Sequence, residues 1–116
     1  MITWTTRHGG SPAAIDRMTT ADLRAEYMIE RIFRPGEACL AYTHIDRMVL
    51  GGIVPTGGAI DIGDGAAVGT AHLFDAREGG IANLGHDPGS VTLDGTRFAL
   101  APRDVLYVGR GARRVE

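Results

Sequence analysis

The segment AYTHIDRMVLGGIVP, residues 41–55, decides the predicted fold. Two apolar, strand-like runs, residues 38–45 and 47–54, meet at a cluster of His44, Asp46 and Arg47. An imidazole, an anion and a cation inside buried strands must either satisfy one another or face a cavity. Side chains alternate along a strand, so this pattern predicts His44 and Asp46 on one face and Arg47 on the other.

The remainder of the chain also predicts β-structure. Thr19 and Asp22 fit a helix-capping signal, which predicts one short helix over residues 20–25. Asp94-Gly95 is the strongest hairpin signal, because both residues tolerate positive φ. Short apolar runs with turn signals every eight to twelve residues, roughly, indicate a β-sandwich or small barrel. Further strands are predicted at residues 27–33, 59–62, 72–76, 81–84, 91–93, 96–100 and 105–108.

Length and composition narrow the class of protein. A chain of 116 residues with 44% hydrophobic residues is expected to form one globular domain over residues 19–116, preceded by a polar N-terminal arm, residues 1–18. The net charge of −2 excludes a global attraction to nucleic acid or acidic membranes. The single cysteine, Cys39, allows no internal disulfide. Without a membrane-spanning apolar run or a secretory signal, a cytoplasmic location is expected.

The second half follows the spacing of a cupin, a small jelly-roll barrel. The marker residues are Gly89, Asp94-Gly95, Pro102, Asp104 and Gly111. The four metal-ligand positions of that pattern fall on His72, Phe74, Glu78 and Arg114. A guanidinium has no lone pair to give, and a catalytic metal site needs about three protein ligands. We therefore expect no metal and no cofactor within this chain.

Four segments together resemble the N-terminal half of the 5-keto-4-deoxyuronate isomerase family: residues 23–27, 42–47, 51–55 and 103–112. The resemblance implies an all-β, cupin-like jelly roll. It also implies a two-cupin, homo-oligomeric enzyme of pectin degradation, whose zinc sits on three histidines and a glutamate in the C-terminal cupin. No counterpart of those ligands falls within this sequence.

The resemblance implies a reaction that moves a proton between adjacent carbons of an anionic keto-uronate, interconverting 5-keto-4-deoxyuronate and 2,5-diketo-3-deoxygluconate. His44 and Asp46 are then the catalytic candidates, as a base with its orienting carboxylate. Arg47 is the candidate for the substrate carboxylate. The competing interpretation is that these residues form a structural or inter-domain network.

The expected function is therefore that of the metal-free N-terminal module of such an isomerase, inactive by itself. The alternative is a stand-alone, non-catalytic cupin-like module that binds a sugar acid or drives oligomerisation. Residues 113–116 fall where a cupin strand should still be running. A strand left there with an unpaired edge predicts self-association.

Overall fold

The computed structural model describes all 116 residues, and strands predominate in it. The strands are β1 (Ile2–Arg7), β2 (Ala38–Thr43), β3 (Met48–Ile53), β4 (Gly79–Ala82), β5 (Gly89–Leu93), β6 (Thr96–Leu100) and β7 (Val105–Val108). The helices are α1 (Pro12–Ile15), α2 (Thr20–Tyr27) and a 3₁₀ turn, Ala66–Val68. The prediction of an all-β fold with little helix is confirmed. Neither α1 nor α2 has the length and apolar character needed to cross a bilayer.

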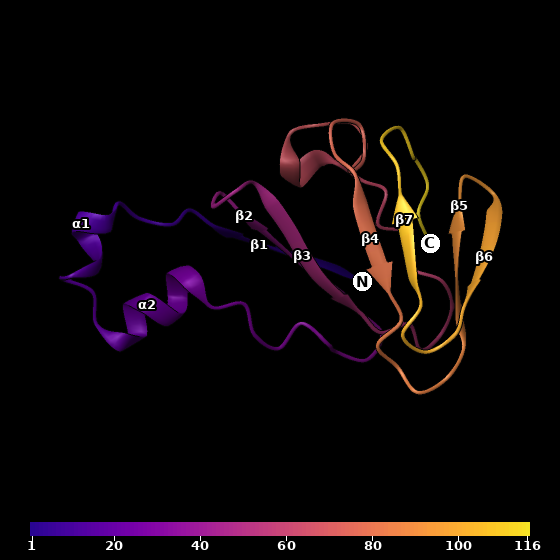
Figure 1. Ribbon diagram of the computed structural model, residues 1–116, viewed down its shortest axis with the longest axis horizontal. Coiled ribbons are helices and arrows are strands. Elements are labelled where there is room, and N and C mark those ends of the chain that lie inside the picture. Colours follow the sequence, from indigo (N-terminus) through magenta and orange to yellow (C-terminus); the bar gives the residue numbers. More distant parts are fainter. The chain divides into compact units, whose positions relative to one another are not determined.

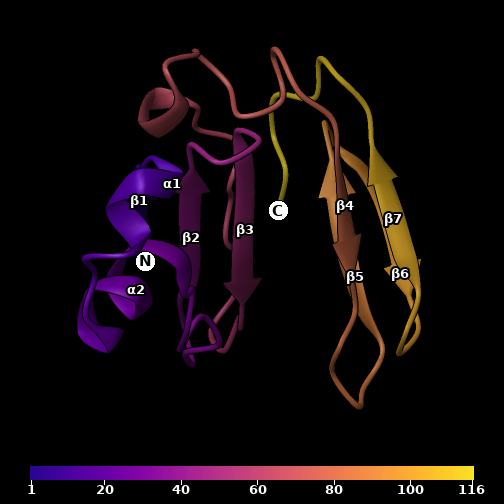
Figure 2. The same cartoon turned by 60° about the vertical axis from the view of Figure 1, so that its left-hand side comes forward.

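The chain divides into two compact units, Met1–Gly58 and Ala59–Glu116. The first contains a three-stranded sheet in the order β1-β2-β3 (Figure 2). β1 runs parallel to β2, and β3 runs antiparallel to it. β2 is the central strand, and its residues Ala38–Ala41 are buried. Both helices lie beyond one end of this sheet, and the chain then returns alongside it (Figure 1).

Helix α2 begins at the predicted cap. The Thr19 hydroxyl accepts a hydrogen bond from the Asp22 N–H (3.2 Å), and the Asp22 carboxylate accepts one from the Thr19 N–H (2.9 Å). The Thr19 N–H and, to a smaller extent, the Thr19 hydroxyl, which also donates to the Asp22 carboxylate (2.8 Å), lower the pKa of that carboxyl. The reciprocal pair satisfies two donors that would otherwise lack partners in the first turn. The predicted helix is confirmed and extends to Tyr27.

The second unit consists of two antiparallel strand pairs, β4–β7 and β5–β6. The predicted hairpin is confirmed: Asp94 (φ 47°) and Gly95 (φ 90°) form the two-residue turn between β5 and β6. Leu93 pairs with Val115, which is 1% exposed. This pairing places the segment that follows β7 against β5. The core of this unit contains Ile62, Leu73, Phe74, Val91, Leu100, Val108 and Val115.

Three strand predictions are wrong, and one strand was missed. Residues 27–33, 59–62 and 72–76 form no strand. In the last two segments, side chains bond to nearby main-chain groups instead: Asp61 accepts from the Gly63 N–H (2.8 Å), and Asp75 accepts from the His72 N–H (2.8 Å). Residues 2–7, expected to lie in a loose arm, form β1 instead. Their mixed polarity suits an edge strand that is only half-buried.

Candidate functional site

The three candidate residues near the start of β3 lie in a turn and not in strands. His44, Asp46 and Arg47 belong to the connection between β2 and β3, and all three are exposed. Asp46 (φ 56°) and Arg47 (φ 52°) both adopt the left-handed conformation, which a strand cannot contain. The predicted division of these side chains between two sheet faces is therefore wrong. No hydrogen bond or ion pair joins the three side chains to one another.

His44 instead lies among aromatic rings. Its ring centroid is 4.9 Å from that of His8 and 4.8 Å from that of Tyr42. The His44 N–H donates to the Arg7 carbonyl oxygen (2.8 Å), which ties the turn to the end of β1. The Ile45 N–H donates to the Thr43 hydroxyl (3.1 Å). These contacts orient the imidazole of His44 without supplying it with a carboxylate partner.

The four cupin ligand positions do not assemble a metal site. His72 Nδ1 lies 3.5 Å from the Asp75 carboxylate, and Phe74 is buried in the core. Nowhere does the chain gather three histidine, cysteine or acidic side chains around a point that could hold a metal ion. The four positions of the cupin pattern therefore do not form a metal-binding set in this chain.

The other two positions have partners of their own. Glu78 accepts a hydrogen bond from the Tyr107 hydroxyl (2.5 Å), and this bond raises the pKa of the phenol. The guanidinium of Arg114 pairs with Glu116 (2.9 Å). The main-chain N–H groups of Arg113 and Arg114 donate to Asp94, at 3.1 and 2.9 Å. These two bonds, with Arg114 contributing more, lower the pKa of the Asp94 carboxyl.

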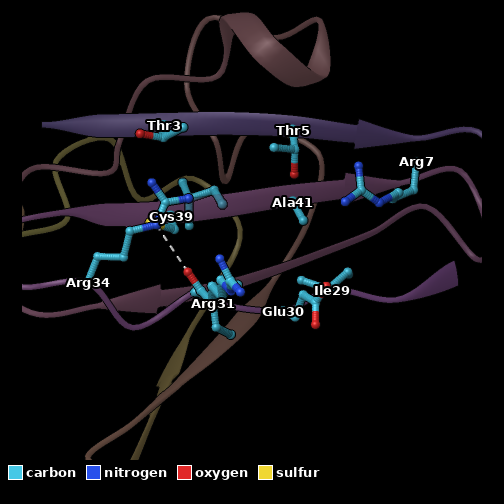
Figure 3. Close-up of a pocket in the computed structure, with 11 residues that line it drawn as sticks. Thr3, Thr5, Arg7, Ile29, Glu30, Arg31, Arg34, Cys39 and Ala41 are labelled. Carbon is cyan, nitrogen blue, oxygen red and sulfur yellow. Dashed lines mark hydrogen bonds between the residues drawn. The ribbon is translucent and has the colours of Figure 1, made fainter. Parts of the chain in front are cut away.

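A cavity of about 160 Å³ lies in the first unit, between the sheet and the segment of residues 29–34 (Figure 3). Its floor comes from alternate residues of β1 and β2, whose parallel register pairs Thr3 with Cys39 and Thr5 with Ala41. Arg7 follows on the same face at the end of β1. The segment that covers this floor contributes Ile29, Glu30, Arg31, Ile32 and Arg34.

The covering segment is held against the sheet at Gly52. A Cβ on Gly52 would stand 2.5 Å from the Ile32 carbonyl oxygen, so only glycine allows this approach. Two main-chain hydrogen bonds fix the end of the segment: Gly36 N–H to the Val54 carbonyl (2.7 Å) and Val54 N–H to the Glu37 carbonyl (3.0 Å). The cavity therefore has a roof fixed by backbone contacts.

Positive charge predominates around the cavity. The Arg7 Nε is buried and has no hydrogen-bond partner. Arg31, at φ 57°, forms no ion pair. Arg34 is already engaged: its Nε donates to the Arg31 carbonyl (3.1 Å), and its guanidinium pairs with Glu37 (3.3 Å).

Two acidic groups accompany these arginines. Glu30, the one acidic residue of the lining, is paired with Arg24 outside it (3.1 Å). The Glu37 carboxylate also accepts from the Cys39 thiol (3.6 Å). With both carboxylates engaged, Arg7 and Arg31 are the cavity's uncompensated cations.

Sequence reasoning did not find this cavity. The signal that could have found it is the alternation in Ile2–Arg7, which places Thr3, Thr5 and Arg7 on one face. The contribution of residues 29–34 has no comparable signal, because it depends on their folding back over strands distant in sequence.

No family model matches the chain. Curated relatives do match it. The 4-deoxy-L-threo-5-hexosulose-uronate ketol-isomerase of Kineococcus radiotolerans is 46% identical over 106 residues, which cover 91% of this chain and 38% of that protein. By sequence, the chain matches part of the 4-deoxy-L-threo-5-hexosulose-uronate ketol-isomerases. The resemblance drawn from the sequence is thereby confirmed.

Other proteins with the same ketol-isomerase name match the chain over a similar extent. The protein of Halalkalibacterium halodurans is 40% identical over 109 residues, covering 94% of this chain and 39% of the relative. The ketol-isomerase 2 of Enterococcus faecalis is 38% identical over 110 residues, covering 95% of this chain and 40% of the relative. The chain thus spans about two fifths of the length of the curated relatives it matches, an extent consistent with an N-terminal half.

Proposed function

We propose that the chain is the N-terminal, metal-free module of a ketol-isomerase that interconverts 5-keto-4-deoxyuronate and 2,5-diketo-3-deoxygluconate in pectin degradation. The observation that carries this proposal is the 46% identity, over 91% of the chain, to a protein named for that uronate ketol-isomerase activity. A cupin-like jelly roll, a homo-oligomeric assembly and a cytoplasmic location belong to the same proposal.

The proposal assigns the zinc chemistry to a part of the enzyme outside this sequence. Its support within the chain is the fate of the four cupin ligand positions, two of which, Phe74 and Arg114, cannot bind a metal. The chain by itself is therefore expected to hold no zinc and to catalyse no isomerisation.

The contribution of this module to catalysis would come from its exposed turn. His44 and Arg47 are exposed in the β2–β3 connection, where a ligand bound elsewhere in a longer protein can be reached. A neutral imidazole can accept a proton from a carbon next to a carbonyl, and a guanidinium can pair with the uronate carboxylate. Asp46 lies in the same turn, without a bond to His44, and its proposed role as an orienting group needs that bond to form in the complete enzyme.

A chimera tests the family function. The matching segment of the Kineococcus radiotolerans relative would be replaced by this chain, and conversion of the keto-uronate would be followed. We expect isomerase activity to be retained, with His44→Gln reducing kcat by at least tenfold and Ile45→Val, in the same turn, leaving it unchanged. A folded chimera without activity would contradict the proposed function, and full activity of the His44→Gln chimera would contradict the role of His44.

The 116-residue chain supplies the second test. Purified without a tag, it should contain far less than one equivalent of zinc and should not convert keto-uronate when zinc is added. Turnover comparable with that of a full-length relative would show that the metal assignment is wrong.

One observation favours the alternative of a non-catalytic module that binds a sugar acid: the cavity with its two uncompensated arginines, Arg7 and Arg31. In this alternative the chain binds an acidic sugar without transforming it. Binding in the absence of zinc, with no turnover in the chimera, would favour it over the isomerase module.

A further inference from the structure

We infer that the cavity between residues 29–34 and the β1–β2 floor is a binding site for a small hydroxy-carboxylate, held by Arg7 and Arg31. This inference concerns a site built entirely within the first unit. It does not depend on the isomerase proposal, because it requires binding alone.

The first observation is that the side chain of Arg7 lacks bonding partners. Its Nε is buried without a hydrogen-bond partner, although a buried donor on a charged group is costly to leave unsatisfied. Arg7 also has no ion-pair partner. An anion in the adjoining cavity would supply both the missing acceptor and the missing counter-charge.

The second step is the placement of Arg31. This residue adopts φ 57°, which costs free energy for a residue with a Cβ. The conformation is held by the Arg34 Nε, which donates to the Arg31 carbonyl oxygen (3.1 Å; dashed line in Figure 3). Arg34 and Glu37 neutralise each other, whereas the guanidinium of Arg31 remains without a partner. Arg31 is exposed and lines the cavity, so its guanidinium is a second free cation there.

The third step is the chemistry of the remaining lining. Thr3 and Thr5 contribute hydroxyl groups from β1, while Ile29 and Ala41 contribute apolar surface. Guanidinium groups match the planar, two-oxygen face of a carboxylate, and threonine hydroxyls suit the hydroxyls of the same ligand. A volume of about 160 Å³ suits a molecule of sugar-acid size or smaller.

A carboxylate fits better than a phosphate here. Phosphate sites typically use main-chain N–H groups at a helix N-terminus or a glycine-rich loop. No helix begins among the lining residues, and none of them is a glycine. The charged donors of this cavity that have no ion-pair partner are the guanidinium groups of Arg7 and Arg31, and the Glu30 carboxylate is already paired with Arg24.

The test is a binding titration on the 116-residue chain, followed by NMR chemical shifts at constant ionic strength near 0.15 M, which screens long-range attraction. The probes are sodium D-glucuronate, D-glucose and inorganic phosphate. Glucose matches glucuronate except for the carboxylate. We expect glucuronate to shift the amide signals of β1 and of residues 29–34, and to bind at least tenfold more tightly than glucose or phosphate.

Variants assign the site. Arg7→Gln and Arg31→Gln should each weaken glucuronate binding at least tenfold, the loss of one charge-assisted pair. Arg17→Gln removes the same charge from an exposed residue outside the lining and should leave binding unchanged. Because Arg7 is partly buried, Thr5→Val provides a second variant that keeps the charge, and it should weaken binding by severalfold.

Four results would overturn the inference: no binding of glucuronate at millimolar concentrations, equal binding of glucose, tighter binding of phosphate, or equal weakening by Arg17→Gln. None of these results bears on catalysis by the chimera, so the failure of this inference and the failure of the proposed function remain distinguishable.

Discussion

Gly52 of β3 lies directly beneath the Ile32 carbonyl group: a Cβ at position 52 would stand 2.5 Å from that oxygen. The missing side chain is what allows residues 29–34 to approach the sheet. The roof of the cavity therefore depends on a residue that does not line it. This relationship gives the first prediction.

Gly52→Ala is expected to lower the free energy of unfolding by about 1–3 kcal/mol, because the backbone must move to admit the methyl group. Urea denaturation measures the change. Gly57→Ala is the matched control, since a Cβ there meets nothing within 4 Å. Equal stability of the Gly52→Ala and Gly57→Ala variants would show that the close approach does not hold the segment.

The cap of α2 gives the second prediction. Thr19→Ala removes the hydroxyl that accepts the Asp22 N–H and should destabilise the first unit by about 1 kcal/mol. Thr20→Ala, one residue further into the same helix, removes a hydroxyl with no capping role and serves as the control. Loss of the cap should loosen the first turn of α2, and the NMR chemical shifts of that turn measure this change directly. Identical shifts in both variants would refute the capping role.

Acid should act on the hairpin between β5 and β6 through Asp94. Its pKa is lowered from the ordinary 3.8 by the N–H groups of Arg114 and Arg113, so the unfolded chain binds this proton more readily than the folded one. The stabilisation is complete above pH 3.8 and is lost as the pH falls through the folded pKa. Asp94→Asn, which tolerates the same positive φ, should therefore be less stable than wild type at neutral pH.

The difference between these two proteins should shrink as the pH falls below that range. Urea denaturation across the acid range, with an NMR titration of the Asp94 carboxyl, measures it. If the difference in unfolding free energy stays constant down to strongly acidic pH, the Asp94 carboxylate does not account for it.

Alkali should act through Tyr107. The bond to Glu78 raises the phenol pKa above 10.0, so its stabilisation is complete below pH 10.0 and is lost as the pH rises through the folded pKa. Glu78→Gln should lower the Tyr107 pKa towards the ordinary value, and ultraviolet absorbance of the ionised phenol follows it. Asp16→Asn, which removes an exposed carboxylate that forms no bond to a tyrosine, should leave that titration unchanged. An unaltered pKa in Glu78→Gln would contradict the hydrogen bond.

The sequence predicted the features that depend on neighbours along the chain. The Thr19–Asp22 cap and the Asp94-Gly95 turn each lie within four residues, and both are confirmed. The family was also correctly recognised from four short segments. Local signals of this kind need no knowledge of the tertiary fold.

The features that sequence reasoning missed depend on competition between local and distant contacts. Residues 44–47 lie between two apolar runs, and the pattern gave no reason to place a left-handed arginine, Arg47, in a turn. The cavity forms because the segment that contains Arg31 covers β1 and β2. Nothing in the sequence of that segment indicates which strands it will cover. No periodicity of residues 29–34 encodes that placement.

The parallel pairing of β1 with β2 has a consequence for how the first unit opens. β2 and β3 are joined by four residues and form a local hairpin, whereas β1 reaches β2 only through residues 8–37. Closing the longer connection costs more chain entropy than closing the short one. In addition, β1 is an edge strand, which is hydrogen-bonded to a neighbour on one side alone. In amide hydrogen exchange, β1 should therefore lose protection at lower free energy than β2, so that part of the cavity's floor can detach while the hairpin stays intact.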